Sequence, residues 1–200
     1  MVIGLTGGVG SGKSTVAKLL ADKWKAKLLI ADEMGHLAYK RDTMAYQKIV
    51  DLFGEGILTD GREINREAIA ECIFKDASLR QKLNGIIHPF VMEMIRQEIA
   101  SFNSQKHEGK PPLILESAIL IESGCAPLCD VIWYVHVPEK IRRQRLKESR
   151  GYSDEKIDDI MASQMAEEEF FRYATDVIEN HGGLEEVFRQ CTGLREKYMI

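Results

Sequence analysis

The sequence predicts an α/β fold in which a parallel sheet of about five strands is covered by helices on both faces. Three observations carry this prediction. Short apolar runs of strand length recur along the chain, stretches of helical periodicity separate them, and a glycine-rich turn joins the first strand to the first helix. Strands that alternate with helices pair in parallel, because each helix crosses over the sheet.

The elements begin with a strand at Val2–Thr6, which leads through the glycine-rich turn into a helix over Ser14–Lys25. A second apolar run, Ala26–Ala31, ends at Asp32. From about residue 34 to residue 105 the pattern is helical and contains no convincing strand. The sequence therefore predicts a helical insertion at this point.

Within the insertion, Asn65 is expected to cap a helix, because its side chain can accept hydrogen bonds from the first turn. His88-Pro89 is expected to restart a helix, since proline fits the first helical position. The polar segment Asn103–Pro112 is expected to be a surface linker.

Strands and helices alternate again after the linker. The expected strands are Leu113–Ser117, Val131–Val137 and Asp176–Glu179, and the expected helices are Glu139–Glu148, Glu155–Arg172 and Leu184–Tyr198. We predict a nucleotide-binding core formed by residues 1–33 and 106–200, with a lid at about 140–155. Residues 34–105 would be the insertion.

The composition excludes several classes of protein. The 200 residues include 27 basic and 31 acidic side chains, which give a net charge of −4 and argue against a nucleic-acid partner held by overall charge. No apolar run approaches the roughly 18 residues of a membrane span, and no signal peptide is evident, so we expect a cytoplasmic protein without a membrane partner. Four scattered cysteines do not form a disulfide framework. We expect a monomer or a weak homo-oligomer.

The strongest chemical signal is the phosphate-binding loop at residues 7–14, which satisfies G-x-x-x-x-G-K-[ST] between a strand and a helix. Its backbone amides and the helix N-terminus can bind phosphate oxygens. Lys13 would reach the β- and γ-phosphates, and the Ser14 hydroxyl would bind Mg²⁺. The residues expected to bind ATP here are Gly8, Val9, Gly10, Ser11, Gly12, Lys13, Ser14 and Thr15.

The loop alone does not identify the reaction. The Asn-Lys-x-Asp sequence that reads guanine in GTPases is absent, whereas Asp32 follows the second strand, where a kinase needs a group to activate the acceptor hydroxyl. Asp32 could instead cap a helix. Residues 140–150 carry six basic side chains and one acidic one, which could be a lid or a solvated helix face. A nucleoside or nucleotide kinase and a non-catalytic ATP-dependent switch remain alternatives.

Further residues give the chain a resemblance to bacterial dephospho-CoA kinases. The resemblance begins at Gly4–Thr15 and continues in the same order through Ala31-Asp32, Phe53-Gly54, Ile57-Leu58, Asp60-Gly61, Asn65-Arg66, Ile73-Phe74, His88-Pro89, Leu120-Ile121-Glu122, Gln164 and Val177–Gly182. The resemblance implies phosphorylation of the ribose 3′-hydroxyl of dephospho-CoA by ATP, with Mg²⁺, to give coenzyme A and ADP.

The same resemblance assigns roles to residues. It implies that Asp32 is the catalytic base, that Lys13 and the lid residues Arg145 and Arg150 act on the transferred phosphoryl group, and that Asn180 lies at the adenine end of ATP. For substrate binding it implies His88, Pro89 and Glu122 beside Asp32, and for the metal it implies Ser14 and, through water, Glu116.

This chain departs from the family pattern at several positions, among them Glu116, which keeps a carboxylate where an aspartate is usual. Ile30 stands where a first aspartate is usual, His36 stands where an arginine is common, and Ala118 replaces a proline. The spacing between Arg145 and Arg150 is one residue longer than usual.

Overall fold

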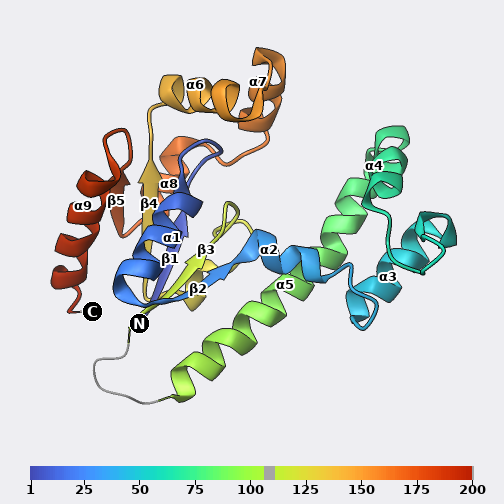
Figure 1. The fold of residues 1–200 in the computed structure, drawn as a ribbon, viewed down its shortest axis with the longest axis horizontal. Coiled ribbons are helices and arrows are strands. Elements are labelled where there is room, and N and C mark those ends of the chain that lie inside the picture. Colours follow the sequence, from blue (N-terminus) through green and yellow to red (C-terminus); the bar gives the residue numbers. More distant parts are fainter. Residues whose placement is uncertain (106–110, 200) are drawn as a thin grey trace. The chain divides into compact units, whose positions relative to one another are not determined.

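The computed structural model describes residues 1–105 and 111–199 (Figure 1). The chain divides into two compact units. Met1–Ile30 and Ser101–Ile200 form the first, and Ala31–Ala100 forms the second. These boundaries lie a few residues before those expected at 33 and 105. Residues 106–110 of the expected linker lie outside the described part of the chain.

The first unit is built on a five-stranded parallel sheet in the order β2-β3-β1-β4-β5. Its strands are β1 (Val2–Thr6), β2 (Lys27–Ile30), β3 (Leu113–Glu116), β4 (Val131–His136) and β5 (Asp176–Glu179). β1 lies between β3 and β4, with Val2 opposite Leu113 and Ile3 opposite Val131. The predicted sheet is confirmed, and the phosphate-binding loop leaves it from the central strand.

Helices cover both faces of this sheet, because successive side chains of a strand point to opposite sides. On one face, α1 (Lys13–Trp24) and α9 (Leu184–Lys197) pack on the core, where the rings of Trp24 and Trp133 meet edge to face at 6.1 Å. On the other face lies α8 (Glu167–Tyr173) (Figure 1). Its Phe170 ring stacks on Tyr134 of β4, with the ring centroids 5.0 Å apart. The other elements of this unit are η2 (Ala126–Leu128), α6 (Glu139–Arg150) and α7 (Asp154–Ala162).

The second unit consists of helices with their own apolar core. Its elements are α2 (Ala31–Leu37), α3 (Met44–Phe53), η1 (Glu55–Ile57), α4 (Arg66–Lys75) and most of α5 (Ser78–Ser104). Ile49, Ile57, Ile69 and Leu83 are buried together at its centre. The predicted cap at Asn65 is confirmed, since its Oδ1 accepts hydrogen bonds from the two amides at residues 67 and 68, at 2.9 and 3.3 Å.

The prediction that Pro89 begins a helix was wrong. His88 and Pro89 lie inside α5, a single helix of 27 residues. A proline within a helix lacks the amide that would bond the carbonyl four residues earlier, here that of Gly85. Because Pro89 and Gly85 are both exposed, water can satisfy that carbonyl and the helix continues.

The single helix expected over Glu155–Arg172 is also wrong, because the structure has two helices, α7 and α8, in its place. Between them, Gln164 leaves the helical path and its Oε1 accepts a hydrogen bond from the Val9 amide at 2.8 Å. This contact with a distant segment interrupts a pattern that is locally helical.

Candidate active site

The phosphate-binding loop between β1 and α1 depends on glycine at two positions. Gly10 and Gly12 both have φ of +79°, a left-handed conformation in which a Cβ atom is strained. Gly12 is the N-cap residue of α1, and the Ser11 amide donates to the Gly8 carbonyl at 3.1 Å. The loop thus turns tightly into the N-terminus of α1, which favours a bound anion.

A cavity of about 830 Å³ lies beside the loop, within the usual size range of small-molecule sites. Eight of the residues predicted to act on ATP line this cavity together, namely Gly10, Gly12, Lys13, Ser14, Thr15, Arg145, Arg150 and Asn180. The loop and α1 form one side, while α6 and the segment after β5 form the other. The structure therefore brings together residues that are up to 170 positions apart in the sequence.

Asn180 connects three parts of this cavity. Its side chain is buried, and Nδ2 donates to the Ser11 carbonyl at 2.7 Å. Its own carbonyl accepts a hydrogen bond from Nη2 of Arg145 at 2.8 Å. A Cβ atom at Gly12 would lie 2.7 Å from Asn180 Nδ2, so the loop approaches this side chain as closely as a glycine allows. Asn180 therefore holds the loop, the end of β5 and α6 in one arrangement.

Oxygen atoms suited to a magnesium ion occur at the end of β3 and the start of α1. Glu116 is 1% exposed and its Oε1 lies 3.9 Å from Nζ of Lys13. The Ser14 hydroxyl belongs to the exposed first turn of α1. Carboxylate and hydroxyl oxygens are ligands that Mg²⁺ accepts, usually together with phosphate oxygens and water. In the described part of the chain, no group of three or more His, Cys, Asp or Glu side chains could hold a metal ion alone.

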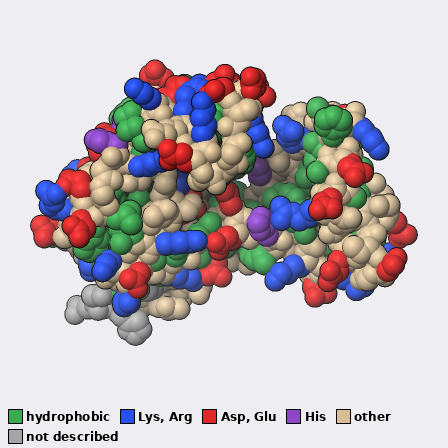
Figure 2. Space-filling model, turned by 45° about the horizontal axis from the view of Figure 1, so that its top comes forward, with side chains coloured by type: hydrophobic (Ala, Val, Ile, Leu, Met, Phe, Trp, Pro, Cys, Tyr) green, Lys and Arg blue, Asp and Glu red, His purple; other side chains and the backbone are tan. Residues whose placement is uncertain are grey.

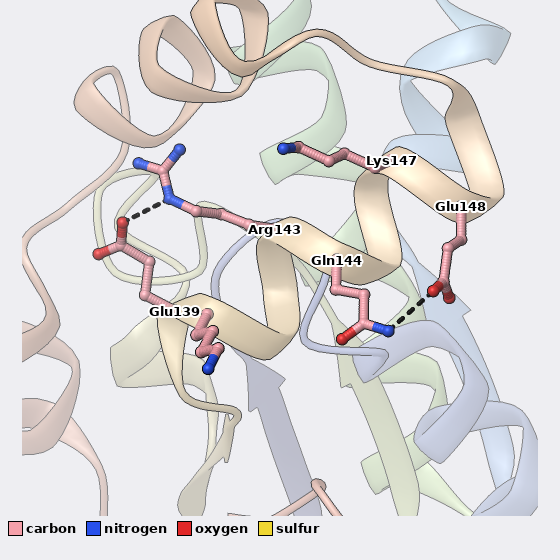
Figure 3. A pocket seen from close by; sticks show the side chains of 6 residues that line it. Glu139, Arg143, Gln144, Lys147 and Glu148 are labelled. Carbon is pink, nitrogen blue, oxygen red and sulfur yellow. Dashed lines mark hydrogen bonds and ion pairs between the residues drawn. The ribbon is translucent and has the colours of Figure 1, made fainter.

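The outward face of α6 carries a separate pocket, of about 590 Å³, whose lining side chains are mostly charged and partly engaged in ion pairs. Arg143 contacts Glu139 at 2.7 Å (Figure 3). Arg143 also pairs with Asp158 of α7, and Lys147 contacts Asp154 at 2.7 Å. The hydrogen bond from Lys147 lowers the pKa of the Asp154 carboxyl. Figure 2 shows a similar mixture of basic and acidic side chains over the surface. Acidic side chains of α7 thus neutralise part of the positive charge of α6.

Sequence reasoning did not assign Arg142 to the site, and it treated Gln164 only as part of a resemblance. Arg142 lies against the loop so closely that a Cβ atom at Gly8 would collide with its Nη1. Gln164 accepts the hydrogen bond from Val9 described above. The periodicity of α6 carries a signal for Arg142, because it lies four residues before the buried Leu146 and so on the same face of the helix.

The other predicted residues lie outside the 830 Å³ cavity. Asp32 is exposed in the first turn of α2, and it is not the N-cap residue. His88 is half-buried and Pro89 is exposed, both in α5. These three residues belong to the second unit. Glu122 is exposed in the turn that follows β3 in the first unit. Their predicted roles in substrate binding stay predictions.

Comparison with known proteins identifies the family. The family model described as dephospho-CoA kinase matches residues 1–186. This chain belongs to the dephospho-CoA kinase family. It is 35% identical to the dephospho-CoA kinase of Geobacter sulfurreducens over 189 residues, which are 94% of each chain. It is 36% identical to that of Bacillus licheniformis over 199 residues, which cover 99% of this chain and 96% of the relative.

Solved structures agree on the fold. A Thermus thermophilus protein superposes with a TM-score of 0.77 at 29% identity, covering 98% of this chain and 97% of that one. Dephospho-CoA kinase from Campylobacter jejuni has a TM-score of 0.72 at 21% identity, covering 98% and 96%. Shikimate kinase from Acinetobacter baumannii has a TM-score of 0.53 at 16% identity, covering 99% and 93%. The dephospho-CoA kinase family consists of phosphotransferases with an alcohol acceptor, so the predicted enzyme class is confirmed. Among the described helices, none combines the length and the apolar character that crossing a membrane requires.

Proposed function

We propose that this chain transfers the γ-phosphoryl group of ATP to the ribose 3′-hydroxyl of dephospho-CoA, giving coenzyme A and ADP in the cytoplasm. The observation that carries the proposal is the glycine loop beside a cavity of about 830 Å³, in a chain whose first 186 residues match the family model. This cavity would take ATP, and the helical unit Ala31–Ala100 would take dephospho-CoA.

The loop residues from Gly8 to Thr15 would hold the phosphates, with the N-terminus of α1 contributing its dipole. Lys13 would contact the β- and γ-phosphates as a point charge. Arg145 and Arg150 would contact ATP from α6, since both line the same cavity. Because charge spreads over the equatorial oxygens during phosphoryl transfer, these cations would stabilise the transition state more than the bound substrate.

Ser14 and Glu116 fit a magnesium ion that arrives with ATP, Ser14 directly and Glu116 through water. The support is the chemistry of the donors, which are a hydroxyl at the start of α1 and a carboxylate buried beside Lys13. A bound magnesium ion would neutralise phosphate charge.

Asp32 would accept the proton of the 3′-hydroxyl as that oxygen forms its bond to the γ-phosphorus and the bond to the ADP oxygen breaks. Its exposed position directly after β2 supports this role, because ligands of parallel α/β sheets bind beyond the carboxyl ends of the strands. His88, Pro89 and Glu122 would contact dephospho-CoA outside the reacting atoms.

The test compares Asp32→Asn with Glu33→Gln, its exposed neighbour in the same turn of α2. Each variant and the parent enzyme are incubated with Mg-ATP and dephospho-CoA, nucleosides or nucleoside monophosphates, and both ADP and phosphorylated product are measured. We expect product from dephospho-CoA alone. D32N should lower turnover by about 10²- to 10⁴-fold with ATP binding retained, because a positioned base contributes about that much. E33Q should match the parent.

Three results would count against the proposal. Near-normal turnover of D32N would remove Asp32 from its role. Product from nucleosides or nucleoside monophosphates alone would indicate a different kinase. ATP binding without transfer to any acceptor would indicate a switch protein.

A further inference from the structure

Arg142 lies at the end of the phosphate-binding loop that β1 enters. A Cβ atom added at Gly8 would collide with Nη1 of Arg142 and would lie 3.6 Å from Oε1 of Gln164. The α6 backbone follows the loop as well, because a Cβ atom at Gly10 would lie 3.0 Å from the Arg142 carbonyl oxygen. The guanidinium group of Arg142 therefore packs directly against the phosphate-binding loop.

The Arg142 side chain is mostly buried, yet few groups around it compensate its positive charge. The side chain is 12% exposed, and its Nη2 lies 3.8 Å from Oε2 of Glu167, beyond hydrogen-bonding distance. Its Nε has no hydrogen-bond partner among the described residues. A buried guanidinium is costly unless its charge and its donors are satisfied, so the site favours an additional anion.

Arg143, the next residue of α6, lies in the opposite situation. Its side chain is 30% exposed and its Nε donates to Glu139 at 2.7 Å (Figure 3). Its Nη2 pairs with Asp158 of α7. The two arginines share a helix and a charge but differ in burial and in partners. Arg143 is therefore a matched control for Arg142.

Two backbone donors of the loop are engaged within the protein. The Val9 amide donates to Gln164, and the Ser11 amide donates to the Gly8 carbonyl. Side-chain donors would add to the remaining amides in binding an anion here, and the guanidinium group offers several in a planar fork. Arg142 also lines a second cavity of about 680 Å³, together with Gln164 and Glu167, so space for a phosphoryl group borders it.

We propose that Arg142 binds the γ-phosphoryl group of ATP, while Gln164 fixes the loop edge by holding the Val9 amide. The proposal rests on the ATP-dependent activity proposed above. ATP bound in the 830 Å³ cavity extends its phosphates along the loop, and its last phosphate reaches Arg142. The guanidinium donors contact the equatorial oxygens and stabilise their charge during transfer. Arg142 takes no part in the proton transfer, which the proposed function assigns to Asp32.

The experiment measures the binding of Mg-ADP and of the non-hydrolysable analogue Mg-AMP-PNP by titration calorimetry, without an acceptor. Arg142→Gln should raise the Kd of AMP-PNP by about 10- to 100-fold, the range of a lost charge-assisted contact, and leave that of ADP unchanged. Arg142→Lys should lie between, because it keeps the charge and loses the fork. Arg143→Gln should bind both nucleotides like the parent. In steady-state kinetics, R142Q should lower kcat by about 10³-fold and leave the KM for dephospho-CoA unchanged.

Equal weakening of both nucleotides by R142Q would overturn the proposal, because Arg142 would then only support the shape of the loop. Unchanged AMP-PNP binding, or the same loss in R143Q, would overturn it as well. Should R142Q fail to fold, R142K decides the question, with normal ADP binding as evidence of an intact loop. Absence of product from dephospho-CoA would contradict the proposed function and leave the nucleotide comparison valid.

Discussion

Replacement of Asn180 by alanine tests whether this side chain holds the ATP site together. The change removes the Nδ2 donor that contacts the Ser11 carbonyl at 2.7 Å, in a place where the asparagine is only 5% exposed. It leaves in place the backbone carbonyl that accepts the hydrogen bond from Arg145. The substitution therefore isolates one contact between the end of β5 and the loop.

The size of the effect follows from burial. A buried carbonyl that loses its donor costs about 1–3 kcal/mol. At about 2 kcal/mol, a protein of this size loses about 4–8 °C in Tm. Nucleotide binding has to restore the loop, so the Kd of ATP should rise about tenfold or more, since each 1.4 kcal/mol corresponds to a factor of ten.

Thermal unfolding followed by circular dichroism measures the first effect, and titration with Mg-ATP measures the second. Asn84→Ala is the control, because Asn84 is exposed in α5 and alanine is the better helix former. N84A should keep the ATP affinity of the parent, and its Tm should be equal or slightly higher. If N180A matched N84A in both measurements, the contact between Asn180 and Ser11 would not organise the site.

Two further predictions concern glycine and cysteine. Gly10→Ala should cost about 1–2 kcal/mol in unfolding free energy and weaken ATP binding, because φ is +79° there and the new Cβ would meet α6. Gly193→Ala is the control: no atom lies near its Cβ in α9, so this change should raise the unfolding free energy by about 0.5–1 kcal/mol. Similar losses of stability in both variants would contradict the argument from backbone strain. Burial raises the pKa of Cys191 to about 12, so its thiol stays protonated at pH 8 and should resist iodoacetamide, whereas the half-buried Cys72 should react first. Mass spectrometry of the alkylated protein checks this order, and early modification of Cys191 in the folded enzyme would refute it.

The sequence was sufficient for the sheet and for the loop, because both leave strong local patterns. The strand Asp176–Glu179 has the bounds expected for it. In residues 7–14, Gly10 and Gly12 adopt the left-handed conformation that the loop requires. The cap at Asn65 was predictable for the same reason, since its chemistry acts over three residues.

Contacts between distant segments were not predictable from local patterns. The contact of Gln164 with Val9 divides a helical stretch into two helices, and nothing in residues 155–172 alone indicates it. His88-Pro89 fits a helix start by its local preference, yet the helix continues through it because the proline lies on an exposed side. Arg142 is one of six basic residues in the segment 140–150; its spacing from the buried Leu146 indicates the inward face of α6, and its packing on Gly8 shows its place at the loop. The roles of Asp32, His88 and Glu122 stay predictions.

The central claim is that this chain places a phosphoryl group on the ribose 3′-hydroxyl of dephospho-CoA. The most direct measurement is ³¹P NMR of the product formed from Mg-ATP and dephospho-CoA, with ADP quantified in the same sample. We predict one new phosphomonoester at the 3′ position, in a one-to-one ratio with ADP. A phosphomonoester at another position, or release of inorganic phosphate in its place, would contradict the claim.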